Sequence, residues 1–296
     1  MSHSQKLGAG DALGTGDSYL ALDVVPPELA DVAFERMREE VEWDVMHHRG
    51  GEVPRLVAVQ GKIGPDGSFP IYRHPSNESP PLNAFSPTID SIRQHVQKIL
   101  NHPVNHVLIQ FYRSGKDYIS EHSDKTIDIV RGSNIVNVSF GAQRMMTLRK
   151  KMPHTHRDLP QMDFPPVAPR PAQRFPLPHN SMFVMGPETN ARWQHGINRD
   201  NRPRKSSAET FQGGERISLT FRHIGTFLNT DKTLIWGQGA VAKTKDVARP
   251  VVHGARELNL TLIGAFGAEN QMSDFNWDEH YGMGFDVVHF KTQVDH

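Results

Sequence analysis

The sequence contains no cysteine among its 296 residues. This absence excludes disulfide bonds, zinc–thiolate sites, iron–sulfur clusters and catalytic thiols, so any metal ion must be bound by His, Asp or Glu side chains. Long apolar runs are also lacking, because no stretch approaches the roughly 18 residues that a membrane-spanning helix requires. The N-terminus has no basic start followed by an apolar run, which is the pattern of a secretory signal. We therefore expect an intracellular protein, cytoplasmic or nuclear, with no membrane partner.

The formal net charge is zero, but the charges are unevenly distributed along the chain. Residues 144–256 carry more than twice as many Lys and Arg as Asp and Glu, whereas residues 1–90 show the opposite balance. A basic middle segment could meet an anionic substrate or a nucleic acid. A solvated surface balanced by acidic ends would give the same pattern, so charge alone does not decide between them.

The N-terminal part predicts a disordered tail followed by two helices. Residues 1–17 are rich in Gly, Ser and Asp, which is typical of a disordered tail. The stretch "PPELADVAFERMREEV" predicts a helix with apolar side chains at helical spacing, namely Leu29, Val32, Ala33, Met37 and Val41. In "SPTIDSIRQHVQKILNH" we expect Thr88 as the N-cap and one apolar face formed by Ile89, Ile92, Val96 and Ile99.

From residue 105 the apolar pattern changes to that of short strands. These are "NHVLIQFY", "NIVNVSFG", "RMMTLRK", "NSMFVMG" and "RISLTFRHI", separated by Gly, Asn, Asp and Pro. Several short strands at such intervals indicate a β-sandwich or jelly roll. Residues 152–179 are proline-rich and predict a long loop, and residues 199–215 predict a second, basic loop. The stretch "GARELNLTLIGAFG" predicts a further helix near the C-terminus.

The stretch "EHSDKT" places His122 two residues before Asp124, shortly after a predicted strand, and His195 follows another strand in "ARWQHGI". Strand ends can bring such distant side chains together, and two histidines with one carboxylate form the facial triad of non-heme iron oxygenases. A second H-x-D pair, His156 and Asp158, lies in the proline-rich segment, where no strand would hold it in place. Because the chain has 17 histidines, spacing alone does not separate a metal site from an ordinary polar turn.

The stretch "RISLTFR" alternates as a strand, with Arg216, Ser218, Thr220 and Arg222 on one face. Two arginines that point into a barrel interior would be unfavourable without anions to bind. A dicarboxylate would supply those anions, because arginine can hold a carboxylate through two parallel hydrogen bonds. An edge strand with its polar face in water is the alternative.

The order of H-x-D, a distant histidine and R-x-x-x-x-x-R resembles the AlkB-like branch of the Fe(II)- and 2-oxoglutarate-dependent dioxygenases. The stretches "FYRSGKDYISEHSD", "VSFGAQRMMTLR", "SMFVMG", "WQHGI" and "RISLTFR" occur in the order of that family. The resemblance implies a mainly β fold with flanking helices around a double-stranded β-helix, which is a jelly-roll variant. It implies a dioxygenase domain over residues 18–225, with the jelly-roll core at about 105–225 and the N-terminal helices packed on it. Residues 226–296 form a C-terminal extension of unknown role.

By match to the family's motif, His122, Asp124 and His195 would bind Fe(II) and carry the catalysis. The residues implied to bind the co-substrate 2-oxoglutarate are Gln110, Tyr112, Arg216, Ser218 and Arg222. In this comparison Arg216 pairs with the distal carboxylate of 2-oxoglutarate, and Arg222 lies near the other carboxylate and near Asp124. The implied reaction uses O2 to convert 2-oxoglutarate to succinate and carbon dioxide while it hydroxylates a substrate C–H bond. An N-methyl group hydroxylated in this way leaves as formaldehyde.

Four departures from the family pattern bear on the substrate. Nucleic-acid repair members usually carry an acidic residue where this chain has Thr126, and an aromatic residue where it has Gln60. Gln110 stands where the family has an asparagine before the tyrosine. The basic segment 199–215 lengthens the spacing between His195 and Arg216. These changes favour a small-molecule substrate over a nucleic acid.

Two alternatives remain open. A nucleic-acid N-demethylase is the first, for which Tyr118, Phe140 and Trp193 are candidate stacking residues. A non-catalytic binding module that retained the barrel is the second.

Overall fold

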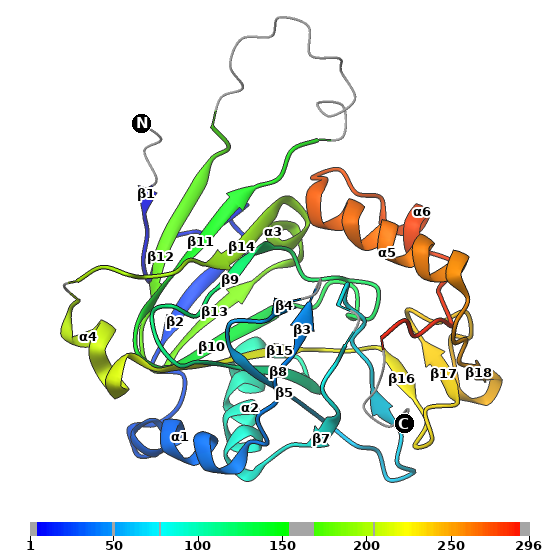
Figure 1. The fold of residues 1–296 in the computed structure, drawn as a ribbon, viewed down its shortest axis with the longest axis horizontal. Helices are drawn as coiled ribbons and strands as arrows, with labels where there is room; N and C mark the ends of the chain where they lie inside the picture. The colour runs from blue at the N-terminus through cyan, green and yellow to red at the C-terminus, as the bar shows by residue number, and fades with distance from the viewer. Residues whose placement is uncertain (1–4, 49–50, 77, 154–168, 204, 291–296) are drawn as a thin grey trace, which may run out of the picture.

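Two β-sheets form the core of the computed structural model, which describes residues 5–48, 51–76, 78–153, 169–203 and 205–290 (Figure 1). The five-stranded sheet contains, in spatial order, β1 (Gln5–Lys6), β12 (Ala172–Leu177), β11 (Arg144–Lys150), β14 (Trp193–Ile197) and β9 (Ile119–His122). The seven-stranded sheet contains β2 (Tyr19–Leu22), β13 (Ser181–Met185), β10 (Ile135–Gly141), β15 (Arg216–Arg222), β8 (His106–Tyr112), β5 (Leu56–Gly61) and β7 (Leu82–Ala84). The predicted double-stranded β-helix, or jelly roll, is thereby confirmed.

Two helices, α1 (Pro27–Glu40) and α2 (Pro87–Leu100), cover the outer face of the seven-stranded sheet, as Figure 1 shows. Their apolar faces share one hydrophobic cluster with Ile217, Leu219 and Phe221 of β15. The other face of β15 looks toward the second sheet, and all seven residues of the strand are buried. Because β15 pairs with β10 on one side and β8 on the other, the alternative of an edge strand is wrong.

The details of α2 differ from the prediction. Its N-cap is Ser86 and not Thr88, because Pro87 already has helical geometry at the first position. The Thr88 hydroxyl instead donates a hydrogen bond of 2.6 Å to the Glu40 carboxylate at the end of α1. Ile99 is 42% exposed and lies outside the apolar face. A contact between helices therefore displaced the predicted cap.

The segment 1–17 was predicted to be disordered, yet from residue 5 onward it has a defined place. Residues Gln5 and Lys6 pair with β12. The Leu13 side chain is fully buried in a second hydrophobic cluster, which includes Leu148 of β11 and Phe175 of β12. Long-range packing, which composition does not show, holds this segment against the five-stranded sheet.

Part of the proline-rich loop predicted over residues 152–179 is in fact the strand β12. Pro176 fits into this strand because β1 pairs only with Gln173 and Arg174, which leaves Pro176 at an edge on that side. The rest of the loop at residues 154–168, with His156 and Asp158, lies outside the described residues.

The C-terminal extension continues directly from the jelly roll. Its strands are β16 (Thr226–Leu228), β17 (Leu234–Gly237) and β18 (Arg249–Pro250), which form a sheet with β6 (Phe69–Pro70) from the N-terminal part. Its helices are α5 (Arg256–Gln271), as predicted, and α6 (Trp277–Tyr281). The smaller elements elsewhere are β3 (His47–His48), β4 (Gly51–Glu52), α3 (Pro187–Arg192) and, inside the predicted loop 199–215, α4 (Ser207–Thr210). Within the described ranges, no helix has the length and apolar character to cross a membrane.

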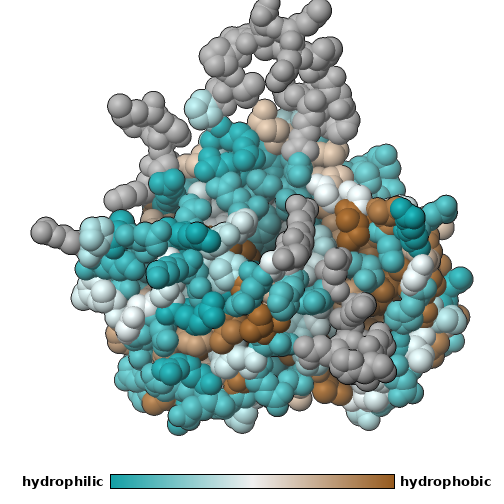
Figure 2. Space-filling model, viewed as in Figure 1, coloured by the Kyte–Doolittle hydropathy of each residue, from teal (hydrophilic) through white to brown (hydrophobic). Residues whose placement is uncertain are grey.

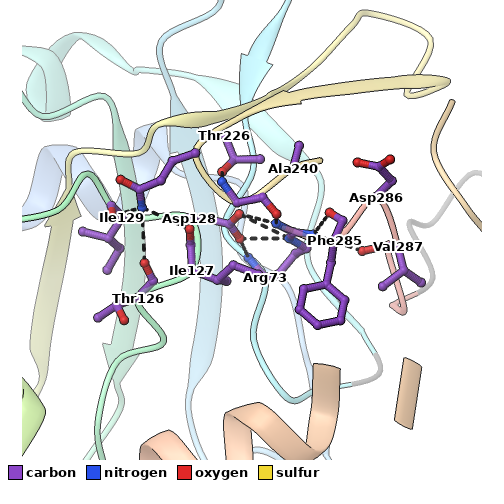
Figure 3. Close-up of polar contacts among 12 residues, drawn as sticks. Arg73, Thr126, Ile127, Asp128, Ile129, Thr226, Ala240, Phe285, Asp286 and Val287 are labelled. Carbon is purple, nitrogen blue, oxygen red and sulfur yellow. Dashed lines mark hydrogen bonds and ion pairs between the residues drawn. The ribbon is translucent and has the colours of Figure 1, made fainter. Parts of the chain in front are cut away.

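The buried side chain of Arg73 joins this extension to the core, as Figure 3 shows. The Arg73 guanidinium donates to the Asp128 carboxylate at 2.7 Å, and both side chains are fully shielded from solvent. Arg73 also donates to the backbone carbonyls of Gly239, Phe285 and Val287. One side chain thus links the loop after the candidate metal ligands to two separate segments of the extension. The division of the chain at residue 225 stays a prediction.

We expect Arg73→Ala to lower the free energy of unfolding by about 3–5 kcal/mol, because it leaves the Asp128 charge buried without its guanidinium partner. The matched control is Arg131→Ala, since Arg131 also pairs across to the extension, with Asp278, but both side chains are exposed. This control should cost only about 0–1 kcal/mol. Urea unfolding of both variants measures the difference, and equal losses would contradict the role given to Arg73.

Candidate active site

Strand pairing brings the three predicted metal ligands together. His122 ends β9, His195 lies in β14, and the two residues are direct partners in the antiparallel register. Their ring centroids are 4.3 Å apart, and Asp124 follows two residues after His122. One nitrogen of each histidine and one Asp124 oxygen all lie within 4.8 Å of one another, which is a geometry that could hold a metal ion.

The Asp124 carboxylate is buried and held from several sides. Its Oδ1 accepts a hydrogen bond from Arg222 at 2.9 Å and a longer one from the Tyr72 hydroxyl at 3.4 Å. The Asn190 side chain bonds to both the backbone N–H and the carbonyl of Asp124, at 2.9 and 3.0 Å. Burial alone would raise the pKa of Asp124, but Arg222 and the two histidines outweigh it and hold the pKa well below its usual value. The carboxylate is therefore charged and rigidly oriented.

Both histidines are neutral at physiological pH. Burial, helped by the neighbouring His195, lowers the pKa of His122 to about 3, and burial lowers the pKa of His195 to about 4. The His122 Nδ1 lies 2.8 Å from the Ser120 carbonyl, so in the neutral ring Nδ1 donates and Nε2 keeps its lone pair. A backbone carbonyl that fixes the tautomer in this way is typical of metal-binding histidines.

The other predicted arginine, Arg216, lies fully buried at the start of β15. Its Nη2 donates to Asn137 Oδ1 at 3.0 Å and to Ser139 Oγ at 2.7 Å, and its guanidinium lies 5.1 Å from the centre of the Tyr112 ring. Burial lowers the pKa of Arg216 to about 10, which still leaves it charged. Ser218, two residues further along β15 on the same face, accepts a hydrogen bond from Asn137 at 2.7 Å. No carboxylate faces Arg216 among the residues that the structure describes.

Several polar atoms of the site lack a partner in the described part of the chain. They are Asp124 Oδ2, His195 Nδ1, and the Nε and Nη1 atoms of Arg216 and Arg222. Buried polar groups are nearly always hydrogen-bonded, so this concentration of unsatisfied donors and acceptors indicates bound groups. A cation beside Asp124 and an anion with two carboxylates between the arginines have the complementary chemistry. The residues thus fit an iron ion and 2-oxoglutarate.

A pocket of about 790 Å³ opens beside these residues. His122, Asp124 and Arg222 line its floor together with Gln110 of β8. The volume falls within the range of about 300–1,000 Å³ that is typical of small-molecule sites. Arg216, Ser218 and Tyr112 do not line this opening, so the candidate co-substrate residues extend inward from it.

Four residues of the site escaped the sequence prediction. Tyr72 stacks on Arg222, with 4.0 Å from the guanidinium to the ring centre, and burial raises its pKa, so its hydroxyl stays neutral. His106 is buried beside Tyr72, and Arg55 lines the pocket next to Gln110. Asn137 bridges Arg216 and Ser218. No local motif marks these residues: His106 and Asn137 reach the site through pairing of distant strands, and Tyr72 and Arg55 reach it from segments next to strands.

Thr126 and Gln60, which were predicted to bear on the substrate, instead contact residues that do not line the pocket. The Gln60 side chain accepts a hydrogen bond from the Ser86 backbone at 2.9 Å, next to the start of α2, and does not line the pocket. The Thr126 hydroxyl donates to the Glu269 carboxylate of α5. The residue types at positions 60 and 126 therefore do not distinguish a nucleic-acid substrate from a small-molecule substrate.

Of the three candidate stacking residues, only Tyr118 lines the pocket. Phe140 and Trp193 are core residues of the two hydrophobic clusters.

Comparison with known proteins identifies the family. The model of the 2OG-Fe(II) oxygenase superfamily matches residues 17–222. The chain is 30% identical over 202 residues to the human DNA oxidative demethylase ALKBH2, which covers 66% of this chain and 69% of that protein. It is 28% identical over 203 residues to the bovine alpha-ketoglutarate-dependent dioxygenase alkB homolog 3, covering 66% of this chain and 62% of that protein. The solved structure of OsALKBH1 is 14% identical, covers 70% of this chain and 98% of that chain, and has a TM-score of 0.43.

The chain belongs to the 2OG-Fe(II) oxygenase superfamily. Within it, the chain is an AlkB-like dioxygenase that depends on Fe(II), 2-oxoglutarate and O2. The predicted enzyme class and cofactors are confirmed, and the alternative of a non-catalytic module is wrong. The prediction that a small molecule is the more likely partner is also wrong, because the human, mouse and bovine ALKBH2 relatives are DNA oxidative demethylases. That prediction relied on Thr126 and Gln60, which do not line the pocket, on Gln110, which does, and on the lengthened segment 199–215.

We expect His122→Ala to weaken Mn(II) binding by more than about 100-fold, because loss of a mere outer-shell partner already costs about 10–100-fold. Mn(II) serves as an air-stable substitute for Fe(II), and titration calorimetry gives its affinity. The control His95→Ala removes a histidine from the outer surface of α2 and should leave the affinity unchanged. If His122→Ala keeps wild-type affinity and the same melting temperature, the ion binds elsewhere.

We expect Arg216→Lys to raise the KM for 2-oxoglutarate by about 10–100-fold, since a charged bidentate contact is worth about 1.5–3 kcal/mol. Lysine keeps the charge but lacks the planar fork. The control Arg149→Lys changes an arginine of β11 that pairs with Glu121 outside this cluster, and it should have no such effect. Succinate formation at varied 2-oxoglutarate concentrations measures both, and an unchanged KM with a lower kcat would contradict the assignment.

Proposed function

We propose that this dioxygenase is an oxidative N-demethylase of nucleic acids. The observation that carries the proposal is its 30% identity to a DNA oxidative demethylase over 202 residues. The family match at residues 17–222 contains every predicted site residue. Such substrates occur in the nucleus and the cytoplasm, where we propose that the protein acts. The C-terminal extension lies outside the family match, which ends at residue 222.

In this proposal His122, Asp124 and His195 hold the iron. The two imidazoles are neutral and the carboxylate is charged, so the three side chains compensate only part of the charge of Fe(II). The facial arrangement leaves adjacent coordination positions for the co-substrate and O2. When bound, the iron supplies the oxygen activation that no side chain of the protein can supply.

Arg216 would bind the distal carboxylate of 2-oxoglutarate through its unsatisfied Nε and Nη1 atoms. Ser218 and Tyr112 lie beside it and offer hydroxyl groups to the same carboxylate. Arg222 has two free donors directly next to Asp124, where the other carboxylate would approach the iron. Gln110, at the floor of the pocket, would contact the co-substrate from the side of β8.

The substrate side of the site suits a nucleic acid. Pro54 lines both the active-site pocket and a second, more open cavity of about 790 Å³, and Tyr118 of the pocket directly follows Asp117 of the second cavity in the chain. The second cavity is lined by four cationic residues, which are Lys116, Arg199, Arg202 and Lys205. Cations beside a deep pocket can bind the phosphate backbone while one base enters the pocket. Asp200 and Glu209 already neutralise Arg202, which leaves the other three for this contact.

The reaction balances as follows. One 2-oxoglutarate, one O2 and one N-methyl group give succinate, carbon dioxide, formaldehyde and the demethylated nitrogen. The Arg222–Asp124 pair is buried and the Tyr72 hydroxyl stays neutral, so neither of these groups exchanges a proton at neutral pH. The residues of the chain therefore bind, orient and shield the reactants.

We expect the purified protein with Fe(II) and 2-oxoglutarate to release formaldehyde and succinate in equal amounts from DNA or RNA oligonucleotides that carry N-methylated bases. The same oligonucleotides without methyl groups are the control and should give no formaldehyde. The KM for the oligonucleotide should rise with salt, because phosphate contacts release counterions. Absence of formaldehyde from every methylated oligonucleotide, while succinate forms slowly, would remove the nucleic-acid assignment and leave the dioxygenase intact.

A further inference from the structure

Helix α5 of the C-terminal extension lies outside the family match, which ends at residue 222, yet it forms one side of the active-site pocket. The pocket-lining residues of α5 are Ile263, Phe266, Gly267, Asn270 and Gln271. On the face drawn in Figure 2, hydrophobic residues gather where α5 lies in Figure 1, while most of the surrounding face is hydrophilic. The pocket wall is thus partly built by a segment that the family fold does not require.

The C-terminal end of α5 is bonded directly to the loop that carries Asp124. Asn270 Oδ1 accepts hydrogen bonds from the Ser123 backbone at 2.9 Å and from the Lys125 ammonium at 3.1 Å. The preceding residue, Glu269, accepts from the Thr126 backbone N–H at 2.9 Å. These contacts flank Asp124 on both sides, so α5 keeps a constant position relative to the candidate metal site.

Apolar packing holds the rest of the helix. Leu262 and Phe266 share a buried cluster with Ile127, which follows Asp124 by three residues, and with Tyr281 of α6. The Tyr281 hydroxyl donates to Glu269 at 2.8 Å, and the Lys151 ammonium donates to the Glu269 carbonyl at 2.7 Å. A helix held by both packing and buried polar bonds is a rigid wall and not a mobile cover.

One position on this wall has no side chain. Gly267 lines the pocket, and a Cβ atom added there would meet no other atom within 4 Å. Its helical neighbour Gly264 has equally open surroundings but does not line the pocket. Glycine in a helix interior costs about 1 kcal/mol relative to alanine, so its presence at position 267 calls for a reason other than helix stability.

We propose that α5 is a specificity-determining wall of the active site, in which Gly267 leaves the space that the substrate occupies beside the metal ligands. This inference rests on the proposed function only for the choice of test substrate. The shape of the pocket is independent of the proposed function. A larger side chain at position 267 would narrow the substrate side of the pocket and leave Arg216, deep on β15, unaffected.

The test compares Gly267→Leu with Gly264→Leu, which make the same chemical change on the same helix. Gly267→Leu should raise the KM for an N-methylated DNA oligonucleotide by about tenfold or more, as is typical of added bulk in a substrate pocket. Its Mn(II) affinity and its KM for 2-oxoglutarate should stay within about twofold of wild type, because a Cβ atom at position 267 meets no metal ligand and no atom of Arg216 within 4 Å, and sites without shared partners rarely couple. Gly264→Leu should match wild type in all three measurements. Equal effects of the two variants, or none, would overturn the proposal.

A second measurement needs no substrate. Because the chain has no cysteine, Leu108→Cys places a single thiol on β8 inside the pocket. A bulky maleimide should label this thiol more slowly when Gly267→Leu is added, and at the same rate when Gly264→Leu is added. If the wild type does not demethylate any oligonucleotide, the proposed function fails, and this labelling still decides whether α5 limits access. An unchanged labelling rate with Gly267→Leu would refute the proposal that α5 forms a wall of the pocket.

Discussion

The antiparallel pairing of β9 with β14 is the constraint on which the candidate site depends, because it sets His195 directly opposite His122. The strands come from distant parts of the sequence, and their hydrogen bonds hold both rings in place before any ion binds. Arg222 then compensates the Asp124 charge from the neighbouring sheet. Two sheets of the jelly roll thus contribute to one site, and a shift of either by one residue would turn its ligands to the other face.

Strand β15 shows how a single element serves both stability and chemistry. Its apolar residues pack under α1 and α2, while its polar residues enter the space between the sheets. Buried arginines are unfavourable unless anions meet them, and Arg216 finds only neutral partners among the described residues. The strand therefore holds a buried positive charge at a position where a dicarboxylate can bind. The apolar packing around the strand stabilises the fold.

The extension beyond the family region is integrated into the enzyme. Arg73 and Asp128 connect it to the jelly roll, and α5 reaches back to the loop around Asp124. The loop after the candidate metal ligands is thus held between the core and the extension. A segment outside the family match is in this way bonded to the loop that carries a candidate metal ligand.

The sequence by itself determined the strand at "RISLTFR", because period-two alternation is a local signal. It indicated the class of fold and the chemistry of the site through the resemblance of its ordered motifs to the AlkB-like family, since the H-x-D spacing alone did not decide. It did not reveal the Thr88–Glu40 contact, the strand around Pro176, or the neighbours Tyr72 and Asn270, and it suggested the wrong class of substrate. Those features depend on which distant segments pack together. Only the tertiary structure decided them, since burial and long-range hydrogen bonds are properties of the folded chain and leave no periodic trace in the sequence.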